Sequence, residues 1–131
     1  LAVDPLNASC NFLLGNIYHA KGRVRDALKI YLYLEKISAE PSPELLFNIA
    51  NAFDKKGDKK KALNYAIYAT EEDPSYIEAY ELTGKLFFDM GDLTEAKTAY
   101  QEILTIERNN INARQMLYVI YTRENRILEK K

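Results

Sequence analysis

The sequence predicts an all-α protein built from repeated helix pairs, and three observations support this prediction. An aromatic residue is followed four positions later by a glycine at Gly22, Gly57 and Gly91. These glycines are 35 and 34 residues apart, and a self-similar period in this range is the signature of stacked helical units. An alanine also follows each glycine after five positions. These alanines are Ala27, Ala62 and Ala96.

Composition limits the class of protein and of partner. Of the 131 residues, 47% are hydrophobic and 28% are charged, a balance typical of a folded chain rather than a disordered one. The net charge of −1 predicts no nucleic-acid partner. No apolar run approaches the roughly 18 residues of a membrane span, so we expect no membrane insertion. The single cysteine, Cys10, fits a reducing compartment, and we expect a cytoplasmic protein.

Two features near the first residue predict a longer parent protein. The chain starts at Leu1 rather than Met, which indicates a fragment or a processed product. The dipeptide Asp4-Pro5 recurs as Asp73-Pro74, where proline ends a helical unit. We therefore expect residues 1–5 to be the tail of a preceding repeat.

Capping and helix-breaking residues predict the first helix pair. Residues 8–21 form a helix, because Asn7 is a good cap and Gly22 ends a helix in the left-handed conformation. A second helix spans residues 24–38 and has one apolar face. That face consists of Ala27, Leu28, Tyr31 and Leu34. The turn at residues 39–42 holds the extra residue of the longer first period.

The same plan predicts five further helices. They span residues 43–56, 59–72, 77–90, 93–106 and 111 to about 129. Asn125 stands where a fourth turn glycine is expected, so the seventh helix continues past it. We expect one domain over residues 1–131. It divides into repeats at about 8–41, 43–76 and 77–110, with a terminal helix or partial fourth repeat at 111–131.

The repeated residues resemble those of the tetratricopeptide repeat family. The matching residues are Leu14, Gly15, Tyr18, Ala27 and Tyr31 in the first unit, Ile49, Ala50, Phe53, Ala62 and Pro74 in the second, and Tyr80, Gly84, Phe87, Ala96 and Tyr100 in the third. The departures are Asn11, Ala66, Thr83 and Arg108. The resemblance implies a right-handed superhelical array of seven helices, an α-α superhelix, and the departures bear on local packing rather than on the fold.

The resemblance also implies a function. In this family the first helices of the units line a concave groove that binds a peptide or a partner helix. The chain would then be a protein-protein interaction module, an adaptor or scaffold that needs no cofactor. The implied groove residues are Phe12, Asn16, Phe47, Asn48, Asn51, Glu81, Lys85 and Phe88. An alternative is that the phenylalanines are half-buried between first helices and the asparagines are only solvated.

One subfamily can be compared residue by residue. Adaptors that hold the C-terminal carboxylate of chaperones do so with two asparagines, lysines and an arginine. Asn16 and Asn48 match the asparagines, whereas Phe12, Glu78 and Leu82 stand where the basic residues would be. A carboxylate would meet no cation there and would be repelled by Glu78. We therefore expect no binding to chaperone C-terminal tails.

We expect neither catalysis nor metal binding. His19 and Cys10 lie on opposite sides of one predicted helix, so they cannot act as base and nucleophile. No pair of His or Cys has metal-ligand spacing, and no glycine loop would bind phosphate.

A second hypothesis is a structural role. The chain would be an internal segment of a longer solenoid that scaffolds or self-associates through its terminal helix. That helix is unusually apolar, with Met116, Leu117, Tyr118, Ile120, Tyr121, Ile127 and Leu128.

Overall fold

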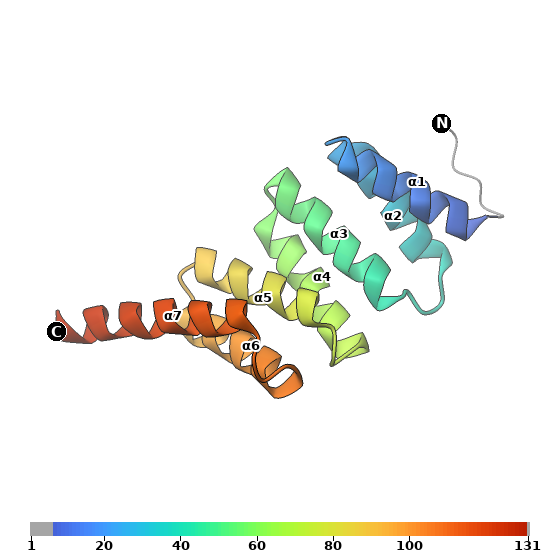
Figure 1. Cartoon of the computed structure of the whole chain (residues 1–131). Coiled ribbons are helices and arrows are strands. Elements are labelled where there is room, and N and C mark those ends of the chain that lie inside the picture. Colours follow the sequence, from blue (N-terminus) through green and yellow to red (C-terminus); the bar gives the residue numbers. More distant parts are fainter. Residues whose placement is uncertain (1–6, 131) are drawn as a thin grey trace. The chain divides into compact units, whose positions relative to one another are not determined.

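The computed structural model describes residues 7–130, which form seven α-helices and no strand (Figure 1). The helices are α1 (Ala8–Ala20), α2 (Val24–Ile37), α3 (Pro43–Lys56), α4 (Lys59–Glu72), α5 (Ile77–Asp89), α6 (Leu93–Ile106) and α7 (Ile111–Glu129). Every predicted helix is present, with ends that differ from the prediction by one residue at most. Asp4-Pro5 lies outside the described residues.

Side-chain caps explain where five of the helices begin. In each case an Asn, Ser or Asp oxygen accepts a hydrogen bond from the backbone N–H three residues later, at distances between 2.8 and 3.3 Å. This bond satisfies one of the N–H groups that the first turn leaves without an intrahelical partner. The five cap residues are Asn7, Ser42, Asp58, Asp92 and Asn110.

The three repeated glycines end the first helix of each pair for the predicted reason. Gly22, Gly57 and Gly91 have φ values of +79°, +98° and +82°. This left-handed conformation is open to glycine but strained for residues with a side chain. It turns the chain so that the second helix of the pair can pack back onto the first.

Within the first and third pairs, the two helices meet where a glycine faces a tyrosine. A Cβ atom on Gly15 would lie 2.6 Å from Cε1 of Tyr31, and one on Gly84 would lie 2.7 Å from Cε2 of Tyr100. The second pair has Ala50 and Ala66 at these positions, both fully buried. In the second pair, Ala66 therefore replaces the tyrosine and Ala50 replaces the glycine, so both members of the contact differ together.

The chain divides into two compact units. The first contains α1 to α4, in which α1 packs on α2, α2 on α3 and α3 on α4. Its largest fully buried side chains are Tyr31, Leu46 and Ile49.

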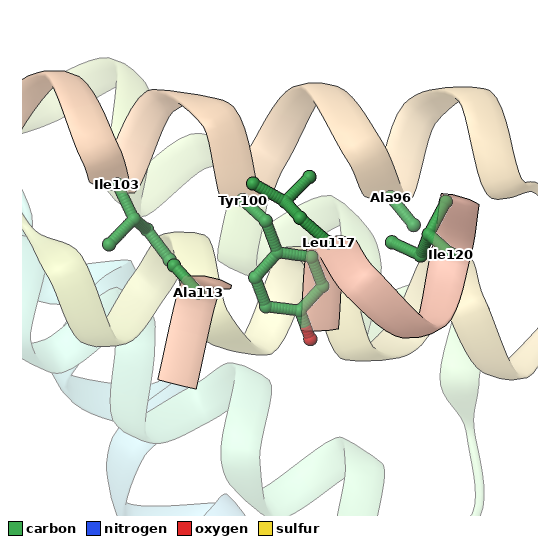
Figure 2. Packing of buried hydrophobic residues seen from close by; sticks show 6 residues of the cluster. All are labelled: Ala96, Tyr100, Ile103, Ala113, Leu117 and Ile120. Atoms are coloured by element: carbon green, nitrogen blue, oxygen red, sulfur yellow. The ribbon is translucent and has the colours of Figure 1, made fainter. Parts of the chain in front are cut away.

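The second unit contains α5, α6 and α7, with α6 packed on both of the others. A cluster of buried small and large apolar side chains joins α6 to α7 (Figure 2). They are Ala96, Tyr100, Ile103, Ala113, Leu117 and Ile120.

None of the helices in the described part of the chain is both long and apolar enough to cross a membrane.

Candidate binding face of α1 and α3

The first unit carries an open apolar hollow of about 710 Å³ between α1, the end of α2 and the start of α3. Its apolar lining is Phe12, Leu13, Leu34, Ile37 and Leu45. The ring of Phe12 lies against Tyr31, with 6.1 Å between the ring centroids. Two carboxylates, Glu40 and Glu44, also line the hollow, and both residues are exposed.

A polar hollow of about 640 Å³ adjoins the apolar one, and the two share Asn16 and Glu44. Its polar lining adds Asn48 and Asn51 of α3, His19 of α1 and Lys55 at the end of α3. Four of the residues that the family resemblance assigns to a groove therefore line these hollows. They are Phe12, Asn16, Asn48 and Asn51.

Two hydrogen bonds orient the side-chain amide of Asn16. The Tyr31 hydroxyl donates to Oδ1 of Asn16 at 2.5 Å, and Nδ2 of Asn48 donates to the same oxygen at 3.0 Å. A carbonyl oxygen has two lone pairs, so these two donors occupy both of them. The Asn16 Nδ2 group, with two N–H donors, lies at the opposite corner of the amide, while Asn48 keeps its oxygen as an acceptor.

The charges differ at the two ends of this face. Burial, with a further contribution from the charge of Glu44, raises the pKa of Tyr31 to about 12, so the hydroxyl is a neutral donor near pH 7. At the other end, burial and the positive charge of Lys55 both lower the pKa of His19 below its usual value of 6.5. The face is therefore acidic at the start of α3 and basic at its end.

The other residues assigned to the groove have different surroundings. Phe47 of α3 is half-buried and is not among the residues that line either hollow. In the second unit, Glu81 accepts a hydrogen bond from Asn112 at 2.7 Å. The guanidinium of Arg123 lies 4.5 Å from the ring centroid of Phe88, which packs against the core of α6 and α7. Lys85 is exposed.

Several residues of the hollows were missed by sequence reasoning. Tyr31 does not line either hollow but donates a hydrogen bond to Asn16, and it belongs to a second helix, where only packing was expected. Among the lining residues, Ile37 and Glu40 come from the end of α2 and the loop after it. One signal could have found them. The extra residue of the 35-residue period lies in that loop, so the first pair joins the second through a longer connection than the second joins the third.

No group of three or more His, Cys, Asp or Glu residues in the described chain could hold a metal ion.

Comparison with known proteins identifies the repeat. Two family models described as tetratricopeptide repeat match residues 9–34 and 47–111. The chain is 36% identical over 91 residues to the heat-shock protein cognate co-chaperone sgt12 of Aspergillus fumigatus, and 27% identical over 96 residues to a DnaJ homolog subfamily C member 3 homolog of Dictyostelium discoideum. These matches cover 69% and 73% of the chain but only 27% and 19% of the two relatives.

Solved structures agree with the family models. The first TPR domain of Spaghetti (RPAP3) bound to the HSP90 peptide SRMEEVD has a TM-score of 0.82 at 29% identity, and the match covers 94% of this chain and 97% of that one. The Sgt2 TPR domain from Aspergillus fumigatus has a TM-score of 0.82 at 27% identity, covering 98% and 85%. The predicted fold class, an all-α array of helix-turn-helix repeats, is confirmed. The chain belongs to the tetratricopeptide repeat family.

Proposed function

We propose that this module binds an extended peptide segment across the face formed by α1 and α3. The observation that carries the proposal is the oriented pair Asn16 and Asn48 beside an apolar hollow. Asn16 offers donors and Asn48 an acceptor, which matches the alternating C=O and N–H groups of an extended backbone. The hollow would hold one side chain of the segment.

Preorganisation supports this proposal. Tyr31 is fully buried, and its hydroxyl donates a hydrogen bond to the Asn16 amide. Because the amide is already fixed, binding the segment costs less conformational entropy. Binding of this kind requires neither a cofactor nor a catalytic residue, and we propose no enzymatic activity for the chain. A cytoplasmic location, where thiols stay reduced, suits the exposed cysteine Cys10.

The ligand of this chain differs, in our proposal, from the acidic chaperone tails in the peptide complexes of its relatives. Besides the HSP90 peptide complex of Spaghetti, the second TPR domain of human RPAP3 was solved with the HSP70 peptide SGPTIEEVD. In this chain Phe12 lines an apolar hollow beside Glu44 rather than supplying a cation. Leu82 is buried and Glu78 is acidic. We therefore expect titration with SRMEEVD to show no binding in the micromolar range, and micromolar affinity would contradict this expectation.

The proposal is tested by selecting binders from a displayed random peptide library and measuring their dissociation constants by fluorescence anisotropy. Replacing Asn16 or Asn51 by Ala removes hydrogen bonds worth about 1 kcal/mol each, so we expect binding to weaken by roughly fivefold to tenfold. Asn64→Ala, at an exposed position of α4, is the matched control. Peptides that bind both site variants as tightly as the original chain would contradict the proposal.

A second candidate function, self-association, is favoured by the outer surface of α7. Ile111, Tyr118, Tyr121 and Leu128 are exposed by 71%, 74%, 45% and 66%, and their spacing of seven, three and seven places them along one side of the helix. Deleting α7 would uncover the core of the second unit, so point changes are the better test. Tyr118→Glu with Leu128→Glu is expected to abolish any concentration-dependent dimer in sedimentation velocity. If the chain is already monomeric at high concentration, this candidate is wrong.

A further inference from the structure

Two of the large apolar side chains that line the hollow are exposed to solvent. Leu13 of α1 is exposed by 61% and Ile37 of α2 by 47%, although both are large aliphatic residues. They stand beside Phe12, whose ring is half-buried. Exposed apolar side chains that gather from two helices around a concavity mark a binding surface more often than scattered ones do.

The charges around this hollow have one sign. Glu40 lies in the loop between α2 and α3, and Glu44 lies in the first turn of α3. No Lys, Arg or His is among the residues that line the hollow within residues 7–130. The nearest basic residue along the chain, Lys36 in the last turn of α2, is not part of the lining. Two carboxylates with no lining cation produce a local negative potential.

The negative charge of Glu44 also acts on the buried Tyr31 side chain beneath the face. Burial first, and then the charge of Glu44, raise the pKa of the Tyr31 hydroxyl, which holds Asn16 in place. Along α3 the sign then reverses, because Lys55 lines the far end of the polar hollow. A bound segment would therefore meet negative charge at the apolar end of the face and positive charge at the other.

We infer that the segment bound by this face places a large apolar side chain in the hollow and carries lysine or arginine directly beside it. This inference rests on the proposed function and adds the chemistry of the ligand to it. The apolar side chain would cover Leu13 and Ile37, and the neighbouring cation would lie near Glu40 and Glu44. Such a segment has the opposite charge to the acidic peptides solved with the relatives.

The test begins with the peptides selected from the random display library. We expect them to be enriched in Lys and Arg next to a large apolar residue and depleted in Asp and Glu. The double variant Glu40→Gln with Glu44→Gln should weaken binding of the best peptide by about tenfold, and added NaCl should narrow that difference. The double variant Glu71→Gln with Glu72→Gln, at exposed positions in the last turn of α4, is the control with the same change of charge. Circular dichroism checks that all variants fold.

Two peptides that differ only in the sign of their charge test which charge the hollow prefers in its ligand. SRMEEVD and its charge-reversed form SRMKKVD differ only at two positions, and the second is expected to bind at least about tenfold more tightly.

The outcomes separate this inference from the proposed function. Selected peptides that lose affinity in Asn51→Ala, yet show no basic preference and bind the double Gln variant unchanged, would overturn the charge inference and leave the binding face standing. A library that yields no binding peptide at all would overturn both.

Discussion

At the scale of single residues, Tyr31 links the packing of a helix pair to the binding face. Its ring fills the space over Gly15, and its hydroxyl donates to Asn16, the neighbouring residue on α1. The same side chain therefore contacts Gly15 with its ring and Asn16 with its hydroxyl. A change in the packing of α1 on α2 should therefore alter the hydrogen bond that orients the Asn16 amide.

Gly15→Ala tests this link. The added Cβ would lie 2.6 Å from a ring carbon of Tyr31, so the ring or the helix must shift. Overpacking typically costs about 1–3 kcal/mol, and alanine returns roughly 1 kcal/mol of helix propensity, so we expect a net loss of up to about 2 kcal/mol. Urea denaturation measures the loss, and the NMR signals of the Asn16 side-chain amide should shift with it.

Cys10→Ala, an exposed substitution on the same helix, is the control for that experiment and should change the unfolding free energy by less than about 0.5 kcal/mol. A Gly15→Ala protein as stable as the original, with unshifted Asn16 signals, would show that ring and amide are not coupled.

The residues of the candidate site were predictable only where the repeat itself places them. Asn16, Asn48 and Asn51 follow from their register on first helices, because helical periodicity fixes which side a residue faces. Ile37 and Glu40 could not be predicted in this way, since their positions depend on how the end of α2 and its loop pack against α1 and α3. That packing is tertiary, and the extra residue of the 35-residue period marks the loop without fixing where its side chains lie.

At the scale of the helix pair, the three repeats solve one packing problem in two ways. Gly15 with Tyr31 and Gly84 with Tyr100 combine the smallest residue with a large ring. The second pair uses Ala50 and Ala66 at the same positions, and both are fully buried. The ring and the glycine therefore belong together, and a tyrosine opposite Ala50 would meet a methyl group where the other pairs have none.

A double-mutant cycle tests this pairing. Ala66→Tyr alone should destabilise the chain by at least about 2 kcal/mol, because a buried alanine site must admit a ring. Ala50→Gly alone should cost about 1 kcal/mol of helix propensity. Combined, they recreate the glycine–tyrosine pair, and we expect a favourable coupling energy of about 1–2 kcal/mol in urea denaturation.

The control for this cycle is Ala69→Tyr, which is also fully buried in α4, combined with the same Ala50→Gly change. It should show no favourable coupling. If the changes in unfolding free energy of Ala66→Tyr and Ala50→Gly simply add, the glycine and the tyrosine of the other pairs do not depend on each other.

The helices themselves could be predicted closely from the sequence because their end signals are local. A cap such as Ser42 acts on an N–H three residues away, and a glycine such as Gly57 acts through its own φ angle. The long α7 was equally predictable, since Asn125 replaces a glycine and the helix continues to Glu129.

At the scale of the whole molecule, buried tyrosines stabilise both units below pH 10. Burial raises the pKa of Tyr31 and of Tyr100 to about 12, with smaller contributions from nearby carboxylates. Burial and a hydrogen bond to Glu35 move the pKa of Tyr65 upward as well. Tyr31 and Tyr65 belong to the first unit and Tyr100 to the second, so both units should respond to alkaline pH.

The sign of this response follows from proton linkage. In the unfolded chain a tyrosine loses its proton near pH 10, whereas the folded chain keeps the proton on Tyr31 and Tyr100 until about pH 12. Above pH 10 the unfolded state thus binds fewer protons than the folded state, and the free energy of unfolding falls as pH rises. Each tyrosine should contribute a decline of roughly 1.4 kcal/mol per pH unit across this window.

Urea denaturation between pH 7 and 12 measures the decline. Above pH 10, Tyr100→Phe should make the free energy of unfolding fall less steeply with pH, by the contribution of one tyrosine. The other groups that titrate there are the same in both proteins. Tyr118→Phe is the matched control, because it removes the same hydroxyl from a side chain that is exposed by 74%. Equal slopes for Tyr100→Phe and the original chain would show that Tyr100 ionises as readily in the fold as outside it, and hence that the core of α6 and α7 admits water at high pH.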